Sequence, residues 1–170
     1  MPRRRKQAKY PYGNLQLHAP SLPALLRQQA QKWPRKCFLQ VWSHENGLQR
    51  QVTYGQLDQR VNELVTSLTA EGVRPGWHVA LLSHNCVEYL EVGLALMALR
   101  AVPVNLNWRQ PVSTLQETVQ LAKCRMMFTS DHFKEASETI CRANKLGSPK
   151  NLVTFGKRAY RDDDHRSDDE

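Results

Sequence analysis

The stretch from Thr53 to Arg109 decides the fold and reads TYGQLDQRVNELVTSLTAEGVRPGWHVALLSHNCVEYLEVGLALMALRAVPVNLNWR. It contains, in order, an amphipathic helix, an apolar strand, a second and more apolar helix, and an extended segment. Parallel neighbouring strands need a crossover connection, which is usually a helix. The stretch therefore predicts an α/β protein with a mostly parallel sheet of alternating strands and helices.

The first helix of this stretch has clear start and stop signals. Thr53 and Gln56 match the S/T-x-x-E/Q pattern of a capping box. Gly72 is the residue type that most often ends a helix in the left-handed conformation. One apolar stripe lies between these ends: Leu57, Val61, Leu64, Val65 and Leu68. The polar residues on the other side are expected to face water: Asp58, Arg60 and Glu63.

The second half of the stretch predicts a buried strand and a buried helix. Residues 77–83 form a nearly continuous apolar run, which is typical of a parallel strand covered on both faces. Asn85 is expected to cap a helix over residues 86–100. Its apolar residues Val87, Leu90, Leu94, Met97 and Ala98 are expected to face one way, the packed side, while Leu96 and Leu99 make the helix apolar nearly all round. Such a helix packs on more than one side. Residues 101–106 return to an extended form, and Pro103 favours an edge or bulged position there.

The same signals continue outward on both sides. Before the stretch we expect a helix capped by Ser21 and closed by Pro34, then a hairpin of strands 37–43 and 48–52 around Asn46-Gly47. After it we expect a helix over 111–122, a strand over 125–129, a helix from the cap Asp131 to about residue 145, and a strand over 151–155.

Composition divides the chain into three parts. Residues 1–20 form a basic arm and residues 157–170 a charged tail, both expected to be disordered, and residues 21–156 form one α/β domain. The net charge of +8 comes from the front, because residues 1–44 hold nine Lys or Arg and no acid. Most such arms are solvated tails, although a basic arm can also bind nucleic acid or anionic lipid.

The lack of a recognisable targeting signal and the spacing of the cysteines predict a cytoplasmic protein. Four separated cysteines without a C-x-x-C pair argue against both a zinc site and a secreted disulfide framework. No apolar run reaches the roughly 20 residues of a membrane span, and no secretory signal is present. Mitochondrial and peroxisomal locations are not excluded.

The sequence offers no catalytic, cofactor-binding or metal-binding residue. It lacks the nucleophile elbow, the P-loop and the dinucleotide-binding glycine motif. The acidic run Asp162, Asp163, Asp164 with His165 is interpreted as a solvated tail, because calcium and zinc sites need fixed geometry. His78, His84 and His132 are each interpreted as structural or surface residues, since none has the i, i+4 spacing of a helix-borne metal site.

Several blocks resemble the N-terminal part of the adenylate-forming superfamily, especially its acyl-CoA synthetases (AMP-dependent synthetases and ligases). VTYGQLDQRVNELVTSLTAEGVRPGWHVALLSHNCVEYLE is similar to the family's opening helix, turn and strand-to-helix unit. AVPVNLNWR is similar to its G-A-V-x-V-x-L-N-x-R segment, LAKCRMMFTSD to its later helix-to-strand unit, and SLPALLRQQAQKWP to its lead-in helix. The likeness spans roughly residues 15–156 and implies the N-terminal α/β subdomain of that family, in incomplete form.

Two departures from the family pattern stand out. Arg100 occupies the place where the family nearly always has glycine, in a tight turn between helix and strand. The family's T-S-G-T-T-G-x-P-K-G loop, which holds the ATP phosphates, and its C-terminal domain with a catalytic lysine are absent from these 170 residues. No family catalytic or ATP-binding residue can therefore be assigned to any position here.

The resemblance implies a fragment of a fatty acid–CoA ligase of the ATP-to-AMP type, inactive by itself. The full-length family uses ATP, Mg²⁺, coenzyme A and a carboxylic acid such as a fatty acid, whereas no cofactor is expected for this chain alone. Two alternatives stay open. One is a non-enzymatic remnant whose exposed apolar face, suggested by the helix over 86–100, binds a protein partner. The other, ranked last, is nucleic-acid binding through the basic arm.

Overall fold

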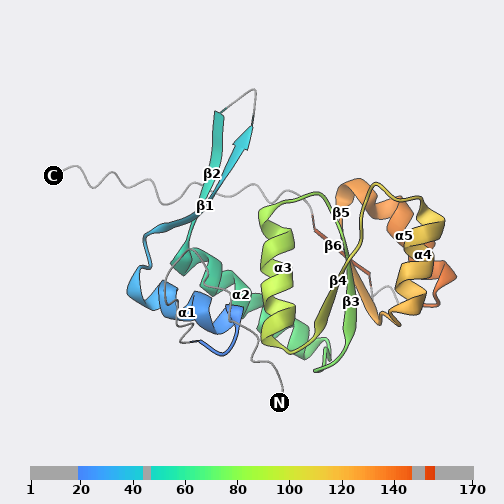
Figure 1. Ribbon diagram of the computed structural model, residues 1–170, viewed down its shortest axis with the longest axis horizontal. Helices are drawn as coiled ribbons and strands as arrows, with labels where there is room; N and C mark the ends of the chain where they lie inside the picture. Colours follow the sequence, from blue (N-terminus) through green and yellow to red (C-terminus); the bar gives the residue numbers. More distant parts are fainter. Residues whose placement is uncertain (1–18, 44–46, 147–151, 156–170) are drawn as a thin grey trace, which may run out of the picture.

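A computed structural model describes residues 19–43, 47–146 and 152–155. They form two sheets and six helical segments (Figure 1). The elements are α1 (Leu22–Lys32), β1 (Cys37–Ser43), β2 (Gly47–Thr53), α2 (Tyr54–Ala70), β3 (His78–Leu82), α3 (Val87–Ala98), β4 (Val102–Asn105), α4 (Val112–Leu121), β5 (Met126–Ser130), the short 3₁₀ helix η1 (Asp131–Phe133), α5 (Lys134–Ala143) and β6 (Leu152–Phe155).

The main sheet has four parallel strands in the order β4-β3-β5-β6. This arrangement confirms the predicted alternation of strands and helices from residue 77 onward. The chain forms β3 first, places β4 on one side of it, and then returns to place β5 on the other side. The sheet therefore has its change of winding direction between β3 and β5.

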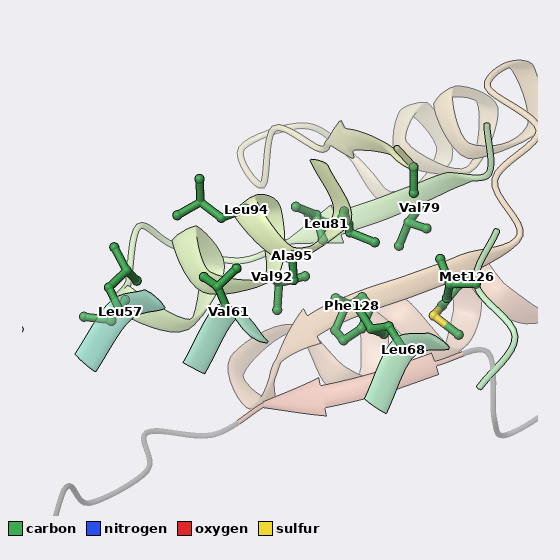
Figure 2. Packing of buried hydrophobic residues seen from close by; sticks show 14 of the residues in the cluster. Leu57, Val61, Leu68, Val79, Leu81, Val92, Leu94, Ala95, Met126 and Phe128 are labelled. Atoms are coloured by element: carbon green, nitrogen blue, oxygen red, sulfur yellow. The ribbon is translucent and has the colours of Figure 1, made fainter. Parts of the chain in front are cut away.

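Helices cover both faces of this sheet (Figure 1). Alternate residues of the central strands point to opposite faces, as strand geometry requires. Val79, Leu81 and Phe128 pack against α2 and α3, as Figure 2 shows. Ala80, Leu82 and Met127 pack on the other face, where α4 and α5 lie. The apolar run over 77–83 is thus explained by burial on two sides.

The antiparallel pair β1–β2 forms a separate two-stranded sheet that projects from the body (Figure 1). The predicted strands are confirmed, whereas the Asn46 part of the predicted turn lies outside the described residues. Phe38 contacts Tyr54 edge-on, with ring centroids 5.0 Å apart. Arg50 donates to Glu88 of α3 at 3.1 Å, which ties the second strand to the body.

Helices α2 to α5 all end in the same motif. The left-handed residue after each helix is Gly72, Arg100, Lys123 or Lys145, with φ of 83°, 57°, 52° and 51°. The next residue in each case donates a backbone hydrogen bond to the carbonyl five residues earlier, as Ala101 does to Leu96 at 2.9 Å. This is the Schellman motif, in which the following residue is usually apolar. Here it is buried each time: Val73, Ala101, Cys124 and Leu146.

Pro103 lies in β4 at one edge of the sheet, as the sequence predicted. Val102 and Leu106 donate backbone hydrogen bonds toward β3, to Trp77 and Leu81. Backbone groups of a strand alternate in direction, so the nitrogen of Pro103 points away from β3. Its missing N–H therefore costs no hydrogen bond within the sheet.

The capping box of α2 is confirmed, because Gln56 N donates to Thr53 Oγ1 and Thr53 N donates to Gln56 Oε1. The predicted cap Asn85 was wrong: Cys86 caps α3, and its Sγ accepts from Tyr89 N at 3.4 Å. Asp131 was also wrong as a cap, because it begins η1 and makes no side-chain capping bond.

Two predictions about exposure were wrong as well. Arg60 does not simply face water: it donates to Glu91 of α3 at 3.0 Å, and burial lowers the pKa of its guanidinium despite the neighbouring carboxylate. Met97 was grouped with the inward residues of its helix, but it is 42% exposed. Helix α3 packs against α1, α2 and β4, so packing on several sides is confirmed. That packing, rather than an exposed apolar face, accounts for its composition.

Candidate functional site

The candidate site is the carboxyl edge of the main sheet, which we define as the segments that follow the parallel strands: residues 83–86 after β3, 106–110 after β4 and 131–133 after β5. Ligands of open α/β sheets bind outside the carboxyl ends of the strands, where the winding direction changes. Here that position lies between β3 and β5. The topology therefore selects this edge before any side chain is considered.

Aromatic and histidine side chains from all three segments meet at this edge. The ring centroid of His84 lies 4.5 Å from that of Trp108, 5.0 Å from that of His132 and 4.8 Å from that of Phe133. The guanidinium carbon of Arg109 lies 4.3 Å from the centroid of the Trp108 ring. The result is one cluster of two imidazoles, two aromatic rings and a cation, built by residues far apart in sequence.

Local hydrogen bonds fix the segments that carry these rings. Ser83 Oγ donates to the carbonyl of His84 at 2.8 Å. Asn107 Oδ1 accepts from Arg109 N at 3.1 Å, and its carbonyl accepts from Gln110 N at 2.9 Å, which together form the turn that presents Trp108. These turns follow directly from strand ends, so the sheet itself determines their spacing.

Buried hydroxyl groups hold the sheet under the cluster. Ser137 Oγ of α5 donates to Thr129 Oγ1 at 2.8 Å, and Thr129 Oγ1 donates to the carbonyl of Leu82 at 3.1 Å. Both hydroxyl-bearing residues are fully buried. These two hydrogen bonds thus link α5, β5 and β3 at the carboxyl end of the strands. Ser130 Oγ lies buried in the same region and forms no hydrogen bond within the described residues.

One potential nucleophile at this edge, a cysteine thiol, is protected by its surroundings. This thiol, that of Cys86, is half-buried, and burial raises its pKa, so it stays protonated near neutral pH and is a poor nucleophile. No group of three or more His, Cys, Asp or Glu in the described part of the chain is placed to hold a metal ion. Aromatic faces with an arginine and two imidazoles are suited to planar rings and anionic groups.

The structure places the histidines considered from sequence in different roles. His78 begins β3, and its Nδ1 contacts the carbonyl of Ala122, which joins the end of α4 to the sheet. His84 and His132 are both exposed and adjacent to each other. The acidic run at 162–165 lies outside the described residues.

Sequence reasoning took His84 and His132 one at a time and missed their proximity. The usable signal was positional, because each residue closely follows a predicted parallel strand. Residues in that position converge at one edge of the sheet. Which strands are neighbours, however, depends on the strand order, and the sequence pattern predicted alternation without predicting that order.

Comparison with known proteins gives a consistent result. The family model described as AMP-binding enzyme matches residues 26–169. Among curated relatives, the chain is 40% identical over 67 residues to a 3-oxocholest-4-en-26-oate–CoA ligase of Rhodococcus rhodochrous, covering 39% of this chain and 12% of that one. It is 30% identical over 117 residues to a 2-succinylbenzoate–CoA ligase of Oceanobacillus iheyensis, covering 66% and 24%. The chain thus spans less than a quarter of the length of either relative.

Solved structures share the fold. A fatty acyl-CoA synthetase of Mycobacterium tuberculosis superposes with a TM-score of 0.65 at 24% identity, over 78% of this chain and 26% of that one. The N-terminal subdomain of NpsA from Klebsiella oxytoca superposes with a TM-score of 0.57 at 25% identity, over 64% and 27%. In the described parts of the chain, every helix is too short or too polar to cross a bilayer.

Proposed function

Because the chain belongs to the family of AMP-binding enzymes, we propose that it forms the N-terminal scaffold of a fatty acid–CoA ligase. The observation that carries this proposal is the family match over residues 26–169 on a four-stranded parallel sheet. The two relatives compared above, at 40% and 30% identity, are named as CoA ligases of 3-oxocholest-4-en-26-oate and of 2-succinylbenzoate. The structural neighbour from Mycobacterium tuberculosis is named as a fatty acyl-CoA synthetase, which supports a fatty acid as the substrate.

The proposed reaction has two steps. A carboxylate oxygen attacks the α-phosphorus of ATP and pyrophosphate leaves, which gives an acyl-adenylate. The thiol of coenzyme A then attacks the acyl carbon, and AMP leaves. ATP and coenzyme A are thus the cofactors of the complete enzyme. Magnesium ion is implied by the resemblance, but the described residues contain no cluster of ligands for it, so we assign it no residue here.

We propose that this 170-residue chain does not perform adenylation by itself. Its sequence holds no Ser/Thr/Gly-rich loop that could surround the ATP phosphates with backbone N–H groups. Its contribution in a complete enzyme would be the carboxyl edge, where Trp108 and Arg109 form a stacked pair. The comparisons give no support to the non-enzymatic or nucleic-acid alternatives.

Two experiments test this proposal. The purified chain, supplied with ATP, Mg²⁺ and C8 to C18 fatty acids, should show no ATP–pyrophosphate exchange, and exchange above a no-protein control would disprove its inactivity. The encoding locus should also be translated beyond codon 156. If it encodes the phosphate-binding loop in frame, the longer product should form acyl-CoA, and failure with every acid tested would contradict the ligase assignment.

The proposed location is the cytoplasm, with the mitochondrial and peroxisomal interiors still open. All four cysteines are free thiols, which agrees with a reducing compartment. Fractionation of cells that express the tagged chain would test this.

A further inference from the structure

The amino edge of the main sheet, opposite the carboxyl edge, has a distinct charge. We define it as the segments that lead into the strands: residues 71–77 before β3, 99–101 before β4, 122–125 before β5 and 144–146 toward β6. These segments hold five exposed cations and one acid, Glu71. The cations are Arg74, Arg100, Lys123, Arg125 and Lys145.

The sheet places these cations in a row. Gly76 N donates to the carbonyl of Arg100 at 2.8 Å, and Arg125 N donates to that of His78 at 2.9 Å, so the segments before β4, β3 and β5 are directly joined. Arg125 also lies over the ring of Trp77, with 5.2 Å to its centroid. Neighbouring strands are about 4.8 Å apart, so the row extends about 15 Å across the four strands.

Three of these cations stand where the backbone favours glycine. Arg100, Lys123 and Lys145 all have positive φ, a conformation that glycine adopts without a steric penalty. Cations near helix C-termini are stabilised by the helix dipole, which offsets part of that cost. These three positions concentrate positive charge at a single edge of the sheet.

Exposed apolar side chains lie among the cations. Leu121, the last residue of α4 and two positions before Lys123, is 83% exposed. Met97 in the last turn of α3 and Val102 at the start of β4 are each 42% exposed. A surface that combines cations with protruding apolar groups matches the interface of an anionic bilayer, where phosphates meet acyl chains. Duplex nucleic acid, by contrast, offers phosphates without an accessible apolar layer beside them.

We propose that the amino edge binds the surface of anionic membranes, with its five cations against lipid headgroups and Leu121 in the interfacial layer. This contact is peripheral, and it leaves the carboxyl edge facing away from the bilayer, because the two edges lie at opposite ends of the strands. The proposal concerns a surface that the ligase reaction does not use, so the two can be tested separately.

The test measures co-sedimentation of the full 170-residue chain with vesicles of phosphatidylcholine containing 30% phosphatidylserine, at 0.1 M salt. The chain is expected to bind these vesicles and not vesicles of pure phosphatidylcholine. The bound fraction is expected to fall as the salt concentration rises. Each basic residue near such a surface contributes about a fivefold change in partitioning. The double variant Arg100→Gly with Lys123→Gly should therefore bind about 25-fold more weakly, while both glycines suit the left-handed backbone.

Matched controls locate the effect. The double variant Lys36→Gln with Lys134→Gln removes the same charge from exposed positions elsewhere and should stay within about twofold of the wild type. Leu121→Gln should weaken binding about tenfold. Leu22→Gln, at another helix end and 60% exposed, should not.

Four outcomes would overturn the proposal. The first is equal binding of the wild type and the Arg100→Gly, Lys123→Gly variant, and the second is equal binding to vesicles with and without phosphatidylserine. The third is that deletion of residues 1–9 abolishes binding while the variants of the amino edge still bind. The fourth is that the chain binds a DNA duplex but no vesicle. The last would assign the edge to nucleic acid instead. Circular dichroism melts of every variant verify that it is folded before binding is compared.

Discussion

Arg100 stands at the left-handed position that ends α3, and its φ of 57° is a conformation that favours glycine. A side chain in this conformation costs roughly 1 kcal/mol relative to glycine. We expect Arg100→Gly to raise the free energy of unfolding by about 0.5–1 kcal/mol, measured by urea denaturation. The reciprocal change Gly72→Ala, at a φ of 83°, should lower it by about 1 kcal/mol. A change of the same sign in the free energy of unfolding for Arg100→Gly and Gly72→Ala would contradict this account.

Cys124 gives a prediction about alkaline pH. Burial raises the pKa of its thiol to about 11, from an ordinary value near 9. Between these two pKa values the folded chain keeps the thiol proton, whereas the unfolded chain loses it. The contribution of the neutral thiol to folding stability is therefore complete below about pH 9 and is lost as pH rises toward 11. The free energy of unfolding should fall between pH 9 and 11. Cys124→Ala should show a shallower decrease over this interval, and an unchanged slope would refute the assignment to this thiol.

At the scale of elements, the two helical glycines differ in the space around them. A Cβ at Gly55 would lie 2.9 Å from the carbonyl oxygen of Pro34, whereas one at Gly93 would meet nothing within 4 Å. Gly93→Ala in α3 should therefore raise the free energy of unfolding by about 0.5–1 kcal/mol, from helix propensity alone. Gly55→Ala in α2 should lower it by about 1–3 kcal/mol through overpacking. Thermal melts of the two variants should shift in opposite directions.

Element-level signals were also where the sequence was most informative. Ser21, Thr53, Gln56 and Gly72 marked helix ends correctly, because capping is a local hydrogen-bonding problem. The error at Asn85 came from a neighbour that caps instead: Cys86 stands directly before Val87, the first helical residue, and Asn85 stands one position earlier. Local patterns can place a helix end to within a residue or two, but they do not decide between adjacent caps.

Long-range contacts explain what the sequence could not predict. Arg60 lies on the polar side of its helix, and its exposure changes only because Glu91 of α3 lies opposite. The cluster of His84, Trp108 and His132 likewise depends on β4 and β5 flanking β3. Neither fact is encoded in a window of ten or twenty residues. The fold class could be predicted from periodicity, whereas the candidate site needed the strand order.

At the scale of the whole molecule, we expect the β1–β2 hairpin to open locally at a lower free energy than the parallel sheet. Its second strand is tied to α3 by the pair of Arg50 and Glu88, both largely buried. Glu88→Gln removes the negative charge that Arg50 contacts at 3.1 Å and should lower the free energy of local unfolding of the hairpin by about 1.5–3 kcal/mol. Amide hydrogen exchange should accelerate in β1 and β2 while β3 and β5 keep their protection. The control Glu63→Gln, on the exposed side of α2, should leave both regions unchanged.

Uniform acceleration across β1, β2, β3 and β5 in Glu88→Gln would show instead that hairpin and sheet unfold as one unit. The exposed apolar side chains of the hairpin make local opening the expected result, because little of its surface is buried. They include Phe38, Val41, Trp42 and Leu48, with Trp42 66% exposed.

The position of Pro103 gives the main sheet two unlike margins. Its ring replaces an outward N–H on β4 and so blocks an incoming strand on that flank. On the opposite flank, β6 has a neighbour on one side only within the described residues. The strand β6 (Leu152–Phe155) contains no proline, so a strand added beside it would keep every backbone hydrogen bond of the ladder, unlike one added beside β4.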